Sequence, residues 1–204
     1  MSKKVVITIS REYGSGGKEV AKLLSQKLNI PYYDKELLLQ INEQSGIDKE
    51  LYDQIYDQVS KKEYYLSIPT TKFIGPSSVL GELSMHEKIY QVQKEVIENV
   101  AKDSCVILGR CSDYILRDNS DAVMVYISAN PEDKKKRAIE DYHEEAEGIE
   151  KTLADMDKRR ANYYNYFSNQ IWGKIGNYDL VVNTSKVGLE HAADVIVAYI
   201  RGRQ

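Results

Sequence analysis

The chain has 204 residues, of which 42% are hydrophobic and 29% charged, and a formal net charge of −3. This length suits a single domain with a large core, and the slightly negative charge argues against a dedicated nucleic-acid binder. No run approaches the roughly 20 apolar residues of a membrane span. The two cysteines, Cys105 and Cys111, cannot form a metal framework and are interpreted as buried, reduced thiols. We therefore expect a cytoplasmic protein without membrane or nucleic-acid partners, and its oligomeric state stays open.

The N-terminal part of the chain predicts two strands and two helices in alternation. Residues 5–9 (VVITI) are β-branched throughout and predict a strand buried on both faces. A helical pattern follows over 17–28, and a short strand is predicted at 29–33. Asp34 then precedes a helix predicted from 35 to 44, in the position of an N-cap.

The alternation resumes after an irregular segment. Residues 46–85 contain prolines and glycines without a regular apolar pattern, and we interpret them as an inserted mobile segment. Further strands are predicted at 104–108, 122–127 and 178–184, and helices at 86–101, from Pro131 onward and at 187–200. Residues 141–161 are highly charged and show no clear apolar face. Strands alternating with helices predict an α/β fold, a three-layer sandwich around a parallel sheet.

The segment ISREYGSGGKEVAKLL, residues 9–24, places a glycine-rich loop between the first strand and the first helix. The dinucleotide pattern G-x-G-x-x-G fails here, because its third glycine would fall on Glu19. The mononucleotide pattern G-x-x-x-x-G-K-[ST] matches at Gly17 and Lys18, but its first glycine falls on Glu12 and its Ser/Thr on Glu19. The pattern alone leaves a strand-to-helix turn without ligand as an alternative.

The position of the loop favours a phosphate site over a plain turn. Glycines at 14, 16 and 17 allow successive N–H groups to point inward, and the helix N-terminus favours an anion. Lys18 lies in the first helical turn, from which it can reach a terminal phosphate. A carboxylate about 4 Å from a phosphate charge costs on the order of 4 kcal/mol at an effective dielectric of 20. Glu12 and Glu19 therefore either point away, or Glu19 binds Mg²⁺, the hypothesis that we favour.

Further candidates lie outside the loop. Arg110 directly follows a predicted buried strand and so lies at the carboxyl edge of the sheet, where its planar fork could grip a phosphate. Asp34 can act as a helix cap or a ligand, and Asp113 can bind substrate or cap the segment after it. Two basic clusters, 134–137 and 158–160, are either solvated surface or a lid that closes over phosphates.

Five segments in this order resemble the cytidylate kinase-like family of P-loop nucleoside monophosphate kinases. They are ISREYGSGGKEVAKLL, IPYYDKELL, VILGRCSDYIL, DMDKRRANYYNYF and YDLVVNTSKVGLEHAADVI. The resemblance implies a three-layer α/β/α P-loop NTPase fold with a five-stranded parallel sheet, a helical lid and an acceptor-binding insert. The single kinase domain would comprise a core (1–45, 86–140 and 162–204), the insert at 46–85 and the lid at 141–161.

The resemblance also implies an activity, the transfer of the ATP γ-phosphate to a nucleoside monophosphate with Mg²⁺, CMP or dCMP being favoured. Residues Gly14, Ser15, Gly16, Gly17, Lys18 and Glu19 would bind the donor, with Glu19 on the metal. The catalytic residues would be Lys18, Arg110, Arg137 and Arg160. The acceptor would be bound by Asp34, Arg110, Asp113 and Asp157.

The chain departs from the family pattern at several positions. Cytidylate kinases resemble D-x-G-P-x-G-x-G-K-G/S-T at the loop, where this chain has Arg11-Glu12-Tyr13 and Glu19. Lys35-Glu36 replaces a stretch of small residues, and Met156 occupies one lid arginine position. These departures leave two alternatives, a kinase of another small metabolite and a nucleotide-binding sensor with impaired catalysis.

Overall fold

In the computed structural model, which describes residues 4–34 and 85–203, five strands form one parallel sheet in the order β2-β3-β1-β4-β5. The strands are β1 (Val6–Arg11), β2 (Tyr32–Tyr33), β3 (Cys105–Leu108), β4 (Ala122–Ser128) and β5 (Leu180–Asn183). The β-branched strand β1 lies at the centre between β3 and β4, which explains why it is apolar on both faces. The predicted five-stranded parallel sheet is confirmed.

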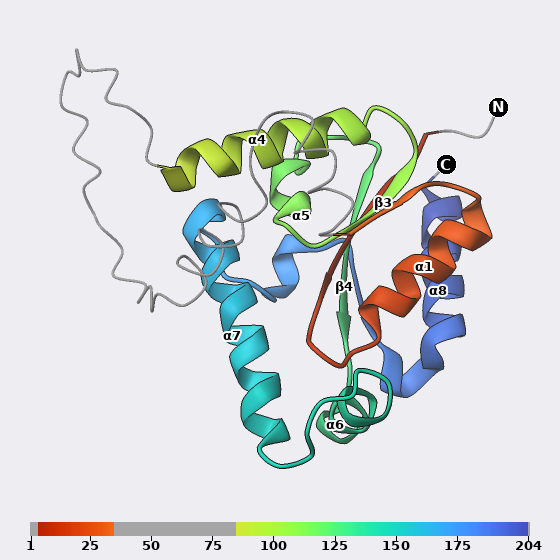
Figure 1. Ribbon diagram of the computed structural model, residues 1–204. Coiled ribbons are helices and arrows are strands. Elements are labelled where there is room, and N and C mark those ends of the chain that lie inside the picture. The colour runs from red at the N-terminus through yellow and green to blue at the C-terminus, as the bar shows by residue number, and fades with distance from the viewer. Residues whose placement is uncertain (1–3, 35–84, 204) are drawn as a thin grey trace.

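Helices cover both faces of the sheet and form the three predicted layers (Figure 1). Helices α1 (Gly17–Leu28) and α8 (Thr184–Gly202) lie on one face, and α4 (Met85–Val100) and α5 (Ser112–Ile115) on the other. Helices α6 (Pro131–Glu140) and α7 (Ile149–Ser168) lie near the carboxyl ends of the strands (Figure 1). A 3₁₀ turn, Ile175–Asn177, precedes β5.

Two apolar clusters hold these layers together. Leu24 of α1 and Ile196 of α8 are fully buried against one face of the sheet, beside Ile7 of β1. Val6, one position earlier in the same strand, faces the opposite cluster with Ile97 of α4. This alternation follows from the two-residue period of a strand, and it fixes β1 and the loop after it from both sides.

Two elements differ from the sequence-based expectation. The charged stretch 141–161 divides into a connection up to residue 148 and the first part of α7, which continues to Ser168. The helix continues because Tyr163 and Tyr164 are buried in the core, whereas its first half carries the charged residues. Helix α8 begins earlier than predicted, at Thr184, and is interrupted at Gly188 with a φ of 77°. The predicted helix at 35–44 and nearly all of the insert at 46–85 lie outside the described residues.

The prediction of two buried, reduced cysteines is confirmed. Cys105 and Cys111 are free and buried, and burial raises the pKa of the Cys105 thiol to about 12, so it stays protonated at neutral pH. Among the helices within 4–34 and 85–203, none has the length and apolar character needed to cross a bilayer.

Candidate functional site

The glycine loop, residues 11–18, turns tightly from the end of β1 into α1. Gly14 and Gly16 have φ angles of 74° and 77°, in the left-handed region that favours glycine. A Cβ on Gly14 would lie 2.5 Å from the backbone oxygen of Lys134 in α6. The Ser15 hydroxyl donates a hydrogen bond to the backbone oxygen of Glu12 (2.7 Å), and the Thr184 hydroxyl donates one to the backbone oxygen of Ser15 (2.7 Å). The loop is therefore held by its own turn and by the start of α8.

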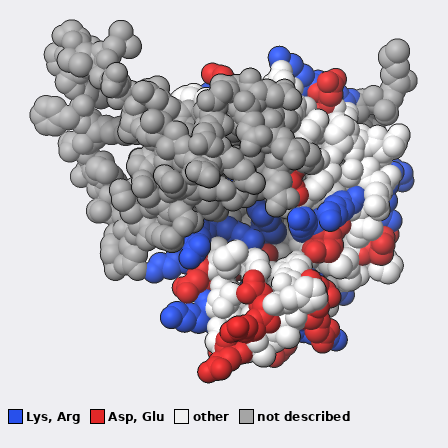
Figure 2. Space-filling view, in the orientation of Figure 1, with Lys and Arg blue, Asp and Glu red and all other residues white. Residues whose placement is uncertain are grey.

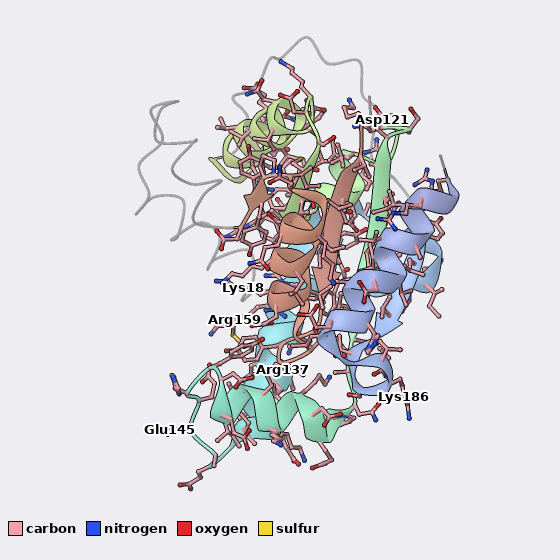
Figure 3. All side chains as sticks on the ribbon, turned by 90° about the vertical axis from the view of Figure 1, so that its right-hand side faces the viewer. Lys18, Asp121, Arg137, Glu145, Arg159 and Lys186 are labelled. Carbon is pink, nitrogen blue, oxygen red and sulfur yellow. The ribbon has the colours of Figure 1, made fainter. Side chains whose placement is uncertain are left out.

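Lys18 projects from the first turn of α1 toward the end of β2. Its ammonium lies 3.6 Å from a carboxylate oxygen of Asp34, which also accepts a hydrogen bond from the Tyr32 hydroxyl at 3.3 Å. The Lys18 side chain is 47% exposed and that of Asp34 only 14%. In Figure 3 the side chains of Lys18 and Arg159 are on the same side of the molecule. Lys18 is therefore accessible to solvent at the mouth of the loop, and the carboxylate of Asp34 lies beside its ammonium group.

The two glutamates of the loop have different partners. Glu12 lies 3.2 Å from the Lys134 ammonium and accepts a hydrogen bond from the Ala129 N–H at 3.3 Å. Glu19 accepts a hydrogen bond from the Tyr142 hydroxyl at 3.1 Å. Glu12 is thus paired with a cation on the side of α6, which offsets the repulsion that the sequence suggested for a bound phosphate.

A cavity of about 250 Å³, here called the arginine pocket, opens beside the glycine loop. Four arginines line it, Arg11, Arg110, Arg159 and Arg160, and so do Ser10, Leu108, Gly109, Cys111, Met156, Tyr163, Tyr164 and Trp172. Lysine and arginine side chains also gather in a band across the middle of the face shown in Figure 2. Since guanidinium groups suit phosphate and carboxylate oxygens, the lining of the pocket has the charge and the donors that an anionic ligand requires.

A buried side chain of α4 fixes the backbone at Arg110. Its φ is 60°, in the turn that leads from β3 into α5. The amide of Gln93 in α4, only 1% exposed, donates a hydrogen bond to the Arg110 backbone oxygen at 2.9 Å. The same Gln93 accepts a hydrogen bond from the Tyr163 hydroxyl at 2.9 Å. This buried network links α4 and α7 and fixes where Arg110 enters the pocket.

Side chains from α6 and α7 contact the backbone of the glycine loop. The Arg137 guanidinium donates to the Gly14 backbone oxygen at 2.5 Å, and that of Arg160 donates to the Arg11 backbone oxygen at 3.1 Å. Asp157 accepts from the Tyr13 N–H at 2.6 Å and lies 3.2 Å from Arg160. Burial raises the pKa of Asp157, while the Tyr13 N–H and Arg160 counteract the rise.

The structure therefore brings most of the predicted residues together and leaves one apart. Lys18, Arg110, Arg137, Asp157 and Arg160 surround the loop and the arginine pocket. Asp113 lines a second cavity of about 190 Å³, with Tyr114, Arg117, Met124, Tyr164, Gln170, Gly176 and Asn177. Burial raises the pKa of Asp113 to about 6, and within the described residues neither of its carboxylate oxygens has a hydrogen-bond partner.

Arg11, Arg159 and Trp172 line the arginine pocket and were not among the site residues predicted from the sequence. Arg11 ends β1 just as Arg110 follows β3, so the same strand-end argument could have identified it. Arg159 was noted only as part of a basic cluster. Trp172 carries no sequence signal, because the turn after α7 brings it back to the pocket.

A glycine loop after the central strand, a lysine in the first turn of the helix that follows and an arginine-lined pocket beside them are the features of a P-loop fold. Solved structures share this fold. A shikimate kinase from Acinetobacter baumannii has a TM-score of 0.54 and 14% identity, with 99% of this chain and 96% of that chain covered. A crystal structure of an uncharacterized protein from Eubacterium ventriosum reaches a TM-score of 0.71 at 30% identity, covering 97% of this chain and 99% of the other.

The chain belongs to the cytidylate kinase-like family, whose model matches residues 6–186. Cytidylate kinases of Aquifex aeolicus and Sulfolobus acidocaldarius are each 26% identical to it. The matches cover 97% of this chain and 96% of the Aquifex protein, and 95% and 93% for the Sulfolobus protein. Family membership confirms a phosphotransferase of the nucleoside monophosphate kinase type and leaves its acceptor open.

Proposed function

We propose that the protein transfers the γ-phosphate of ATP to a nucleoside monophosphate, with CMP or dCMP as the preferred acceptor. The observation that carries the proposal is the arginine pocket, which adjoins the glycine loop at the carboxyl end of the sheet. A donor held in the loop and an anionic acceptor held in the pocket would meet between Lys18 and Arg110. The relatives named cytidylate kinase support CMP as the first acceptor to test.

In this proposal the residues act by positioning and by neutralising charge, as phosphoryl transfer requires. Residues 14–18 hold the donor phosphates with backbone N–H groups and the Lys18 ammonium. Arg110 grips the acceptor phosphate, and Asp34 contacts the acceptor while orienting Lys18. Arg137 and Arg160 bind the backbone of the loop and add positive charge beside the transferred group. Asp157 orients Arg160, and Asp113 supports the site through Tyr164, which lines both cavities.

Magnesium fits the residues at the mouth of the loop. Asp34 lies 3.6 Å from the Lys18 ammonium, and Glu19 directly follows Lys18 in the first turn of α1. Within the described residues, no cluster of three or more histidine, cysteine, aspartate or glutamate side chains could hold a metal ion. Glu19, with Asp34 nearby, would therefore hold Mg²⁺ together with the phosphates, as is usual for this ion. The bound ion supplies charge neutralisation between donor phosphates.

The partners of the two glutamates argue against the sensor alternative. That alternative required Glu12 and Glu19 to repel the nucleotide phosphates. Glu12 instead pairs with Lys134, and one oxygen of Glu19 accepts from Tyr142 while the other can face the ion. An active kinase is therefore the better proposal.

The test is acceptor-dependent ADP release from Mg²⁺·ATP with CMP, dCMP, UMP, dUMP, AMP and GMP. The wild type is compared with Lys18→Ala and with Lys22→Ala, an exposed lysine one turn further along α1. We expect release stimulated by CMP or dCMP, with kcat/KM lowered at least about 100-fold by Lys18→Ala and unchanged by Lys22→Ala. Full turnover in Lys18→Ala would refute the assignment. If none of the six acceptors stimulates release, another metabolite is the acceptor, and calorimetric ATP binding then separates a kinase from a protein without donor site.

A further inference from the structure

Arg11 lies where the glycine loop and the arginine pocket meet. It is the last residue of β1, and its backbone is held by the pairing of β1 with β4 and by the hydrogen bond from Arg160. We propose that the Arg11 guanidinium contacts the phosphoryl group as it passes from donor to acceptor, which makes Arg11 a catalytic residue. This inference rests on the proposed kinase function.

The Arg11 side chain packs against two glycines, Gly17 and Gly109, and these contacts define its course. A Cβ on Gly17, the first residue of α1, would lie 2.5 Å from Arg11 Cβ and 2.8 Å from its Cγ. A Cβ on Gly109, in the turn before Arg110, would overlap Arg11 Nη1 and lie 3.3 Å from Cζ. The side chain therefore runs from the donor loop across Gly17 and ends on the turn that presents Arg110. Because neither glycine has a Cβ, the Arg11 side chain can occupy the space beside both.

The charge of Arg11 reaches both halves of the site. Its side chain lines the arginine pocket with Arg110, Arg159 and Arg160. Its Cβ and Cγ also lie against Gly17, the first residue of α1, and the next residue of that helix is Lys18. A planar guanidinium with five donors can bind oxygens of two phosphates at once, which a lysine cannot do with the same geometry.

The position of the Arg11 side chain offers a physical explanation for the sequence Arg11-Glu12-Tyr13, which departs from the loop motif of cytidylate kinases. Glu12 is directed to Lys134 and is neutralised there, whereas Arg11 points its charge into the site. The net effect is one more cation beside the transferred phosphoryl group, where negative charge spreads over the equatorial oxygens in the transition state.

The test compares Arg11→Met, which keeps an apolar stem, Arg11→Lys, which keeps the charge, and the control Arg117→Met. Arg117 is an exposed arginine that lies beside Asp118 and over the Tyr114 ring, outside the arginine pocket. With the best acceptor, we expect Arg11→Met to lower kcat about 100-fold and to change the Kd of ATP less than threefold. Arg11→Lys should recover part of the loss, and Arg117→Met should match the wild type. A kcat within threefold of wild type in Arg11→Met overturns the proposal.

A second variant separates this role from folding. Gly109→Ala places a methyl group at the Arg11 guanidinium without removing any charge. If it acts by displacing Arg11, the double variant with Arg11→Met will have the kcat of Arg11→Met alone. Additive losses of kcat in the double variant would overturn the proposal. So would a purely structural role, which would appear as thermal unfolding of Arg11→Met at the assay temperature together with wild-type kcat in Arg11→Lys.

A binding measurement separates failure of this inference from failure of the proposed function. Linear inorganic pentaphosphate, which can occupy the loop and the pocket together, is titrated into each protein by calorimetry. We expect Arg11→Met to weaken its binding at least tenfold, even if none of the tested acceptors is phosphorylated by the wild type. Equal binding by the wild type and Arg11→Met, or no binding by the wild type, overturns the role of Arg11.

Discussion

At the scale of single residues, buried charge is the feature of this protein with the clearest consequence. Asp113 is only 3% exposed, and burial raises its pKa from the ordinary 3.8 to about 6. Its folded form therefore binds a proton more tightly than its unfolded form does. By linkage, this residue favours folding at low pH, and its contribution is lost as the pH rises from about 4 to about 6.

The first prediction concerns the free energy of unfolding of Asp113→Asn. A shift of about two pKa units corresponds to roughly 3 kcal/mol as an upper estimate. We expect the wild type to lose stability relative to Asp113→Asn by up to this amount between pH 4 and pH 7. Urea unfolding of both proteins across this range measures the difference. A constant difference between the two proteins would contradict the raised pKa.

At the scale of elements, the glycine loop depends on a close approach between two backbones. Gly14 and Gly148, which precedes α7, have nearly equal φ angles of 74° and 75°. A Cβ on Gly14 would meet the backbone oxygen of Lys134 at 2.5 Å, whereas a Cβ on Gly148 would meet nothing within 4 Å. The two positions thus separate backbone strain from the contact between the loop and α6.

We therefore predict different outcomes for Gly14→Ala and Gly148→Ala. Both pay the left-handed penalty of about 1–2 kcal/mol for a residue with a Cβ. Gly14→Ala must also displace α6, so its free energy of unfolding should fall further and its ATP binding should weaken. Urea unfolding and calorimetry with ATP measure the two effects. Equal behaviour of both variants would show that the approach of α6 is not required.

At the scale of the whole molecule, the first part of α7 and its preceding connection contact the glycine loop through polar side chains. The Tyr13 hydroxyl donates to Glu144 at 2.6 Å, and burial together with Glu144 raises its pKa to about 12. The rings of Tyr13 and Tyr142 are 5.5 Å apart, and Tyr142 donates to Glu19. These contacts join the segment around 141–148 to the loop in the described conformation.

We expect Tyr13→Phe to weaken this junction without unfolding the sheet. Loss of one such hydrogen bond costs about 1 kcal/mol, which corresponds to roughly fivefold faster amide exchange at 141–148. Hydrogen exchange followed by mass spectrometry measures this segment against β1. Tyr199→Phe, in α8, serves as the control. Unchanged exchange at 141–148, or equal acceleration throughout the protein, would contradict the role of Tyr13.

The sequence by itself determined the alternation of strands and helices, the place of the glycine loop and the position of Arg110 after a buried strand. These features are local, because β-branched runs, glycines and strand ends lie within a few neighbouring residues. Lys18 and Gly14–Gly17 could be identified for the same reason, and the place of Arg11 at the end of the first strand was an equally local signal.

Only the tertiary structure decided the partners of these residues. Arg137 reaches Gly14 across 123 positions of the chain, and Asp157 reaches Tyr13 across 144. Glu12 is neutralised by Lys134, Asp113 faces the second cavity, and Arg11 crosses Gly17 and Gly109 into the arginine pocket. Such pairings depend on how helices pack over the ends of the sheet, and a charge read in sequence does not reveal which side of a loop it will face.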